Sequence, residues 1–155
     1  EKRSFSYYCV HGKGRITMRR FIFASHHKLA YGLKDTVDFL TGATKTIYDI
    51  NAYLDDETKD IDTVVAELFA SFDDEDEVVV LVDMMGGSVY QKFYPYMSDK
   101  VHVICGMSLP MALSFVLAPE DECLTSEDVE EMLMECKNQL VYVNKMAASV
   151  DEDDE

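Results

Sequence analysis

The spacing of apolar residues along the chain changes repeatedly between that of a strand and that of a helix. Four runs rich in β-branched and aromatic residues predict strands at residues 19–25, 46–53, 78–82 and 101–105. The third run, Val-Val-Val-Leu-Val, does not alternate with polar residues. Both faces of that strand are therefore expected to be buried, as in a parallel sheet.

Apolar residues at helical spacing fill most of the chain between and after these strands. They predict helices at residues 29–41, 61–72, 88–97, 109–117 and 126–140. Gly42 suits the position after a helix, Asp60 suits an N-cap, and Ser108 followed by Pro110 suits a helix start. The stretch 118–124 is expected to be a loop or a short irregular strand.

Strands that alternate with helices imply right-handed crossovers and an α/β fold. We predict a doubly wound, mainly parallel four-stranded sheet of order 2-1-3-4, with helices on both faces. In this order the first and third strands are neighbours, and the chain leaves them toward opposite faces. Ligands of such sheets bind in the crevice between those two carboxyl ends.

The two ends of the chain lack these patterns and are set apart from one domain at residues 18–148. Residues 1–17 show neither periodicity, so they are interpreted as a disordered arm, a cloning remnant or a segment before a true start at Met18. The last residues from Asp151 onward are all acidic. Residues 149–155 are therefore expected to form a disordered acidic tail.

Composition and charge exclude several classes of protein. A net charge of -16 argues against a nucleic-acid-binding protein, which needs a basic face. The charge suits a protein with basic partners, although a solvated acidic surface has the same signature. The four cysteines lack Cys-x-x-Cys spacing, which predicts reduced cytoplasmic thiols and neither a zinc site nor a redox motif. No apolar run approaches the roughly 20 residues of a membrane span.

Two predicted strands end in side chains that can take part in a reaction. His26 stands at the end of the first strand and Asp83 at the end of the third, so the two are predicted to face each other. A carboxylate that accepts one ring N–H fixes the imidazole tautomer and leaves the other nitrogen as a nucleophile near neutral pH. We therefore predict that His26 carries a phosphoryl group and that Asp83 orients the ring.

A phosphoryl group on His26 needs hydrogen-bond donors for its oxygens. The helix after His26 offers backbone amides, and the loop after the third strand offers the amides of Gly86 and Gly87 and the Ser88 hydroxyl. Met84 lies in the same loop and is counted with these phosphate-binding positions, although apolar cover is its simplest role.

Each of these features has an ordinary structural explanation. A lone histidine after a strand is more often structural than reactive, and Gly-Gly-Ser is a common turn. His26 and His27 do not predict a metal site, because adjacent side chains of a strand-like segment point apart. No cofactor is predicted. The joint placement of the histidine, the carboxylate and the serine is what supports a reactive site.

Three motifs, in order, resemble those of a known family over residues 19–144. That family is the enzyme IIA component of the mannose family of the bacterial phosphoenolpyruvate:sugar phosphotransferase system, abbreviated PTS. The motifs are IFASHHKLAYGL at residues 22–33, LVDMMGGS at residues 81–88 and GMSLPM at residues 106–111.

The resemblance implies a cytoplasmic phosphotransferase with a phosphohistidine intermediate. His26 would accept a phosphoryl group from phospho-HPr and pass it to a IIB domain, which phosphorylates sugar entering through membrane IIC and IID subunits. Asp83 would orient the imidazole and Ser88 would contact the phosphoryl group. The family is commonly a homodimer that exchanges a strand near the C-terminal part, so the sheet would gain an extra edge strand.

The chain departs from the family pattern at three positions and leaves two other functions open. His27 replaces a glycine, Val89 a proline and Ser108 an asparagine. The first alternative is the phosphotransfer subunit of PTS-dependent dihydroxyacetone kinase, which typically lacks the Gly-Gly-Ser stretch. The second is a non-catalytic regulatory domain on the same fold. The sequence does not indicate which sugar is transported.

Overall fold

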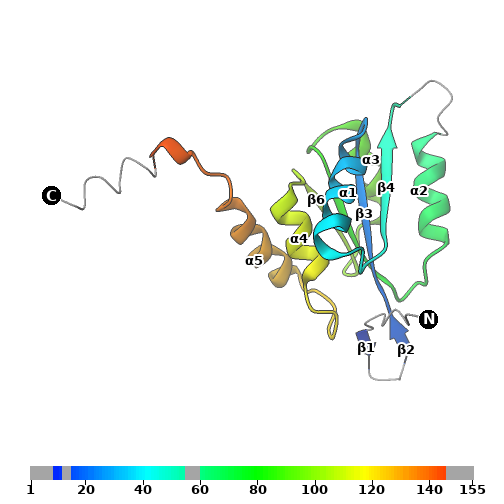
Figure 1. Cartoon of the computed structure of the whole chain (residues 1–155). Coiled ribbons are helices and arrows are strands. Elements are labelled where there is room, and N and C mark those ends of the chain that lie inside the picture. Colours follow the sequence, from blue (N-terminus) through cyan, green and yellow to red (C-terminus); the bar gives the residue numbers. More distant parts are fainter. Residues whose placement is uncertain (1–8, 12–14, 55–59, 146–155) are drawn as a thin grey trace.

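A computed structural model describes residues 9–11, 15–54 and 60–145 of the chain (Figure 1). Its main sheet has four strands, β3 (Arg19–His26), β4 (Ile47–Ala52), β5 (Glu77–Val82) and β6 (Val101–Cys105). They are parallel and lie in the order β4-β3-β5-β6. This is the predicted 2-1-3-4 order, so the α/β class and the sheet topology are confirmed.

Helices cover both faces of this sheet (Figure 1). They are α1 (Leu29–Thr41), α2 (Ile61–Ala70), α3 (Ser88–Phe93), α4 (Leu109–Leu117) and α5 (Ser126–Lys137), with a 3₁₀ turn η1 (Tyr94–Tyr96). Apolar residues of α1, α4 and α5 pack on one face, and those of α2 and α3 on the other. All residues of β5 are buried because helices lie over both of its faces.

Three residues are predicted from the sequence to lie at helix ends, and the structure shows what each does there. Gly42 follows α1 in the left-handed conformation, with φ of 70°, and donates its N–H to the Asp38 carbonyl. The Ser108 hydroxyl accepts the Met111 N–H and caps α4. Asp60 precedes α2 as predicted, but its side chain makes no capping hydrogen bond.

Two helices are shorter than the sequence predicts. The predicted helix at 88–97 ends at Phe93, because Pro95 has no N–H and its ring crowds the preceding turn, and η1 follows. The predicted helix at 126–140 ends at Lys137. Leu140 has the apolar spacing of the helix, but it lies outside both core clusters and is 86% exposed.

The structure adds a small feature that the sequence analysis does not predict. Strands β1 (Cys9–His11) and β2 (Arg15–Thr17) pair in an antiparallel ladder. Strands this short show no alternation of apolar and polar residues. Residues 1–8, 12–14 and 146–155 lie outside the described residues, so the division into arm, domain and acidic tail stays a prediction.

A buried ion pair joins the amino ends of β3 and β5. Arg19 and Glu77 are direct partners across the two strands, and their side chains are 2% and 3% exposed. The guanidinium also donates to the carbonyls of Pro119 and Glu122 at 2.8 and 2.9 Å. Glu77 accepts the Leu124 N–H at 2.6 Å. The stretch 118–124, a loop, is thereby tied to the sheet.

Among the described residues, none of the helices combines the length and the apolar character needed to cross a bilayer.

Candidate active site

His26 and Asp83 meet at the carboxyl rim of the sheet. His26 is the last residue of β3, and Asp83 directly follows β5. Asp83 Oδ2 accepts the His26 backbone N–H at 2.8 Å and lies 2.7 Å from His26 Nδ1. One carboxylate oxygen therefore fixes both the backbone and the ring of the histidine.

The same carboxylate is itself held in place. Its other oxygen, Oδ1, accepts the Met84 N–H at 2.9 Å, and the Asp83 N–H donates to the Ala24 carbonyl at 3.2 Å. The Asp83 side chain is only 11% exposed. The Met84 amide, counted from the sequence among the phosphate-binding groups, thus holds the carboxylate in this structure.

These contacts decide which ring nitrogen of His26 can react. A carboxylate accepts but does not donate, so the proton of the neutral ring belongs on Nδ1 and the lone pair on Nε2. Nε2 lies 3.4 Å from Ser88 Oγ, and the His26 side chain is 38% exposed. The arrangement provides an oriented nucleophile that another molecule can reach.

The glycine loop brings backbone close to the imidazole. Gly86 has φ of 76°, a left-handed conformation that favours glycine. A Cβ placed on Gly87 would lie 3.1 Å from His26 Cε1 and 3.2 Å from Met84 Cγ. Gly87 precedes Ser88, the first residue of α3. Any side chain at residue 87 would therefore push the ring or the methionine aside.

The start of α1 differs from the sequence expectation that its amides would serve a phosphoryl group. The Ala30 N–H donates to Ser25 Oγ at 2.7 Å, and the Tyr31 N–H donates to Asn51 Oδ1 at 3.0 Å. Lys28, at the N-cap position, makes no capping hydrogen bond with its side chain. Two of the expected amides are thus already satisfied by side chains.

His27 occupies an unusual backbone position. Its φ is 52°, in the left-handed region that favours glycine, and its N–H donates to the Ala52 carbonyl at 2.7 Å. The side chain is exposed. The Asp83 carboxylate pairs with the ring of His26, not with that of His27. This favours His26 as the reactive histidine.

Two further residues at this rim escaped the sequence analysis. The Tyr53 ring stacks on the His26 ring, with centroids 5.7 Å apart, and its hydroxyl donates to Ser88 Oγ at 2.7 Å. Cys105 ends β6, and burial together with the charge of Asp83 raises the pKa of its thiol. The thiol is therefore a poor nucleophile, whereas Tyr53 belongs to the site.

Residues 20–133 match the model of the EIIA-man family, the PTS system fructose IIA component. No curated protein sequence matches the chain significantly.

Several solved structures share the fold. A Klebsiella pneumoniae protein assigned as a phosphoenolpyruvate-dependent sugar PTS permease is 31% identical, with a TM-score of 0.76 over 89% of this chain and 98% of its own. A Streptococcus pneumoniae PTS IIA protein associated with a fucose utilization operon is 20% identical, with a TM-score of 0.72 over 84% and 97%. The mannose/sorbose-specific IIA subunit of Enterococcus faecalis is 16% identical, with a TM-score of 0.68 over 79% and 92%.

The family match covers most of the chain, includes the rim that holds the histidine, and agrees with the identity to the Klebsiella protein. The chain therefore belongs to the EIIA-man family and is a IIA component of the bacterial phosphotransferase system.

Proposed function

We propose that His26 Nε2 carries the phosphoryl group in this PTS component. The observation that supports this most strongly is the 2.7 Å contact between Nδ1 and Asp83 Oδ2, which leaves Nε2 unprotonated. Phospho-HPr is the donor. As the new N–P bond forms, the bond from phosphorus to the donor breaks, and no proton has to leave Nε2.

The acceptor is a IIB domain, which passes the phosphoryl group to sugar entering through IIC and IID subunits. This relay operates in the cytoplasm. Because transfer depends on positioning and on stabilising charge over the phosphoryl oxygens, the groups beside Nε2 matter most. We assign that role to the Ser88 hydroxyl and to the backbone of Gly86 and Gly87. Asp83 balances the positive charge that develops on the ring.

Phosphorylation of His26 can be tested with the donor cascade. We expect phosphoenolpyruvate, enzyme I and HPr to label the wild-type protein with an acid-labile phosphate, and His26→Ala to abolish the label. His27→Ala is the matched control and should keep it, because its ring lacks the carboxylate partner. Peptide mapping by mass spectrometry identifies the site. Label that persists in His26→Ala, or a wild-type protein that takes none, would refute the phosphocarrier role.

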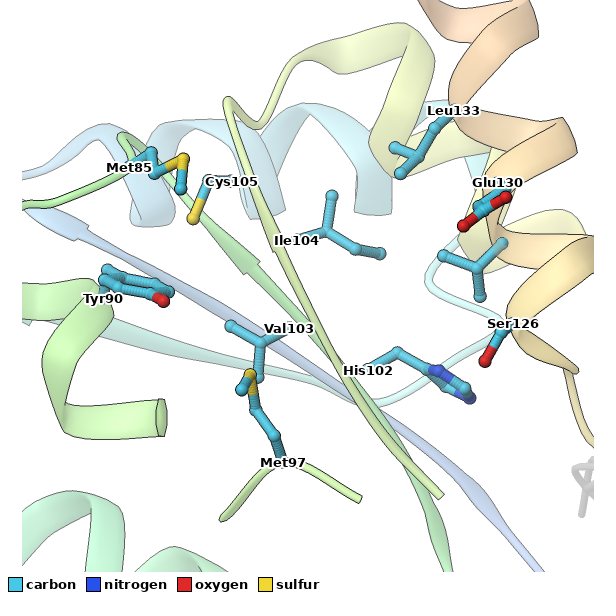
Figure 2. Close-up of a pocket in the computed structure, with 11 residues that line it drawn as sticks. Met85, Tyr90, Met97, His102, Val103, Ile104, Cys105, Ser126, Glu130 and Leu133 are labelled. Carbon is cyan, nitrogen blue, oxygen red and sulfur yellow. The ribbon is translucent and has the colours of Figure 1, made fainter. Parts of the chain in front are cut away.

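We also propose that the protein is a homodimer built along the free edge of β6. Within the described residues β5 is the one strand that pairs with β6, and a single bridge to Ser98 occupies the edge at Val101. Its outer side borders a groove of about 490 Å³ whose lining includes Tyr90, Met97 and Leu133 (Figure 2). His102 Nε2 lines the same groove, is buried, and lies 3.5 Å from Glu77 Oε1. Such an edge accepts an added strand.

A segment of the same chain suits that edge. Residues 140–143, Leu-Val-Tyr-Val, follow α5 and are between 47% and 86% exposed. In Figure 1 residues 138–145, which follow α5, lead away from the sheet. Exposed consecutive apolar residues of high β propensity are uncommon on a monomer. We infer that this segment is the exchanged strand that the family resemblance implies.

The dimer has a direct test in solution. We expect sedimentation equilibrium at micromolar concentration to give twice the chain mass, and Val141→Pro to shift the protein toward monomer, because proline removes a ladder N–H. Val141→Thr keeps that N–H and should remain dimeric. A monomeric wild-type protein, or a dimer unaffected by the proline, would contradict the proposal.

A further inference from the structure

We propose that Tyr53 is a positioning residue that aims the Ser88 hydroxyl at the reacting nitrogen of His26. This inference rests on the proposed phosphocarrier function. It concerns a residue outside the three motifs that carry the family resemblance. The first argument is its placement. Tyr53 directly follows β4, whose last residue, Ala52, is the register partner of His26. The parallel ladder therefore sets Tyr53 beside the imidazole.

The second argument is the direction of the hydrogen bonds. The Tyr53 hydroxyl donates to Ser88 Oγ at 2.7 Å, so the serine oxygen acts as acceptor in that bond and keeps its own hydrogen for another group. The acceptor within reach is His26 Nε2, at 3.4 Å. This distance is long for a hydrogen bond, so the lone pair of Nε2 is only weakly engaged.

The arrangement suits both states of the histidine. Before transfer the serine hydrogen faces the lone pair of Nε2. After transfer Nε2 has no lone pair to offer, and the same hydrogen can turn to a phosphoryl oxygen. Tyr53 keeps the Ser88 oxygen in place during this change. Hydrogen bonds to a charged phosphoryl oxygen are stronger than neutral ones. The direction of the Ser88 hydroxyl therefore affects the transfer rate.

The third argument is the conformation of Tyr53 itself. Its φ is 62°, in the left-handed region, where a bulky side chain is strained. Its ring stacks on the imidazole with an interplanar angle of 28°. Strained residues persist where surrounding contacts hold them, and they gather at functional sites. Among the described residues, Ser88 and His26 are in contact with the Tyr53 side chain.

The test distinguishes the contribution of the Tyr53 hydroxyl from that of the Tyr53 ring. Tyr53→Phe keeps the ring and removes the hydroxyl, and Ser88→Ala removes its partner. We expect Tyr53→Phe to lower the maximal rate of His26 phosphorylation by phospho-HPr about tenfold. The HPr concentration at half-maximal rate should change little. The loss should vanish when Ser88 is already alanine, because Tyr53 acts through that hydroxyl.

Two results would overturn the role of Tyr53. One is a wild-type rate in Tyr53→Phe, and the other is an equal loss in the presence and absence of the Ser88 hydroxyl. Tyr94→Phe is the matched control, since Tyr94 is exposed, contacts the ring of Tyr90 and lies outside the site. Its rate should equal that of the wild type.

A second measurement needs no phosphate donor. The ¹⁵N resonance of His26 Nε2 reports the hydrogen bond to its lone pair. We expect this resonance to move in the same direction in Tyr53→Phe as in Ser88→Ala, and an unchanged resonance in Tyr53→Phe would refute the proposal. If the two variants show this shift pattern but the wild-type protein takes no phosphate, only the phosphocarrier function is refuted.

Discussion

Asp83→Asn is expected to slow phosphorylation of His26 by up to about 10⁴-fold, the loss seen when the tautomer-fixing carboxylate of a serine-protease triad is replaced by its amide. The reason lies in the two sides of the Asp83 carboxylate. Oδ2 faces two donors on His26, and Oδ1 faces the Met84 N–H. An asparagine has one oxygen and one NH₂ group, so it cannot accept on both sides.

Neither orientation of the asparagine side-chain amide reproduces the hydrogen bonds of the Asp83 carboxylate. With its oxygen toward His26, its NH₂ group opposes the Met84 N–H, and two donors face each other. With its oxygen toward Met84, the NH₂ group faces Nδ1, which must then accept. The ring proton moves to Nε2, the nitrogen that has to attack. The mutant should therefore bind HPr normally but react slowly.

Pre-steady-state labelling with phospho-HPr measures this effect, with circular dichroism to confirm folding. Asp35→Asn is the matched control, because it removes the same charge from an exposed position of α1. It should react at the wild-type rate. A folded Asp83→Asn protein that reacts within a factor of about three of the wild type would rule out the tautomer argument, since a lost tautomer costs far more.

Glu77→Gln is expected to lower the free energy of unfolding by about 3–5 kcal/mol, the usual cost of breaking a buried ion pair. The substitution leaves the Arg19 guanidinium buried without its counter-charge. It also weakens the acceptor for the Leu124 N–H, which anchors the loop at 118–124. Urea unfolding at neutral pH measures the loss.

The neighbouring residue Glu75 supplies the comparison. Glu75 pairs with Lys100 where both side chains are more than a third exposed. Because water and salt screen such a pair, Glu75→Gln should change the free energy of unfolding by about 1 kcal/mol or less. Equal losses of unfolding free energy in the two variants would show that burial does not make the Arg19–Glu77 pair more stabilising than an exposed pair.

The same pair predicts how stability depends on pH. Burial raises the pKa of Glu77, but its contacts with His102 and Arg19 outweigh that effect, and the pKa lies below its ordinary value. A carboxyl whose pKa is lower in the folded protein contributes stability above its unfolded pKa of about 4.3. That contribution disappears as the pH falls through the folded pKa. Glu77→Gln should therefore flatten the acid limb of the stability profile.

The sequence predicted the sheet because its strands carry strong local signals. The apolar run at 78–82 indicated a strand buried on both faces, alternation with helices indicated a parallel sheet, and the predicted order 2-1-3-4 is the order observed. The meeting of His26 with Asp83 followed from that order alone. Pro95 lies within the helix predicted at 88–97, and this signal in the sequence accounts for the earlier helix end.

Other features depend on information that local patterns lack. Tyr53 enters the site through the register between β3 and β4, which no single segment encodes. Asn51 takes up the Tyr31 amide only because the start of α1 and the end of β4 lie side by side, whereas Ser25 reaches the Ala30 amide within the turn after β3. The capping box formed by Thr125 and Asp128 could have been found from its spacing, Thr-x-x-Asp.

The Arg19–Glu77 ion pair and the His26–Asp83 pair lie at opposite ends of the same two strands, β3 and β5. A chain that paired these strands one residue out of step would pull Arg19 from Glu77 and His26 from Asp83 together. Misassembled molecules should therefore be less stable to unfolding and unable to accept phosphate. The fraction of a preparation that accepts phosphate should then serve as a built-in measure of how much of it has folded correctly.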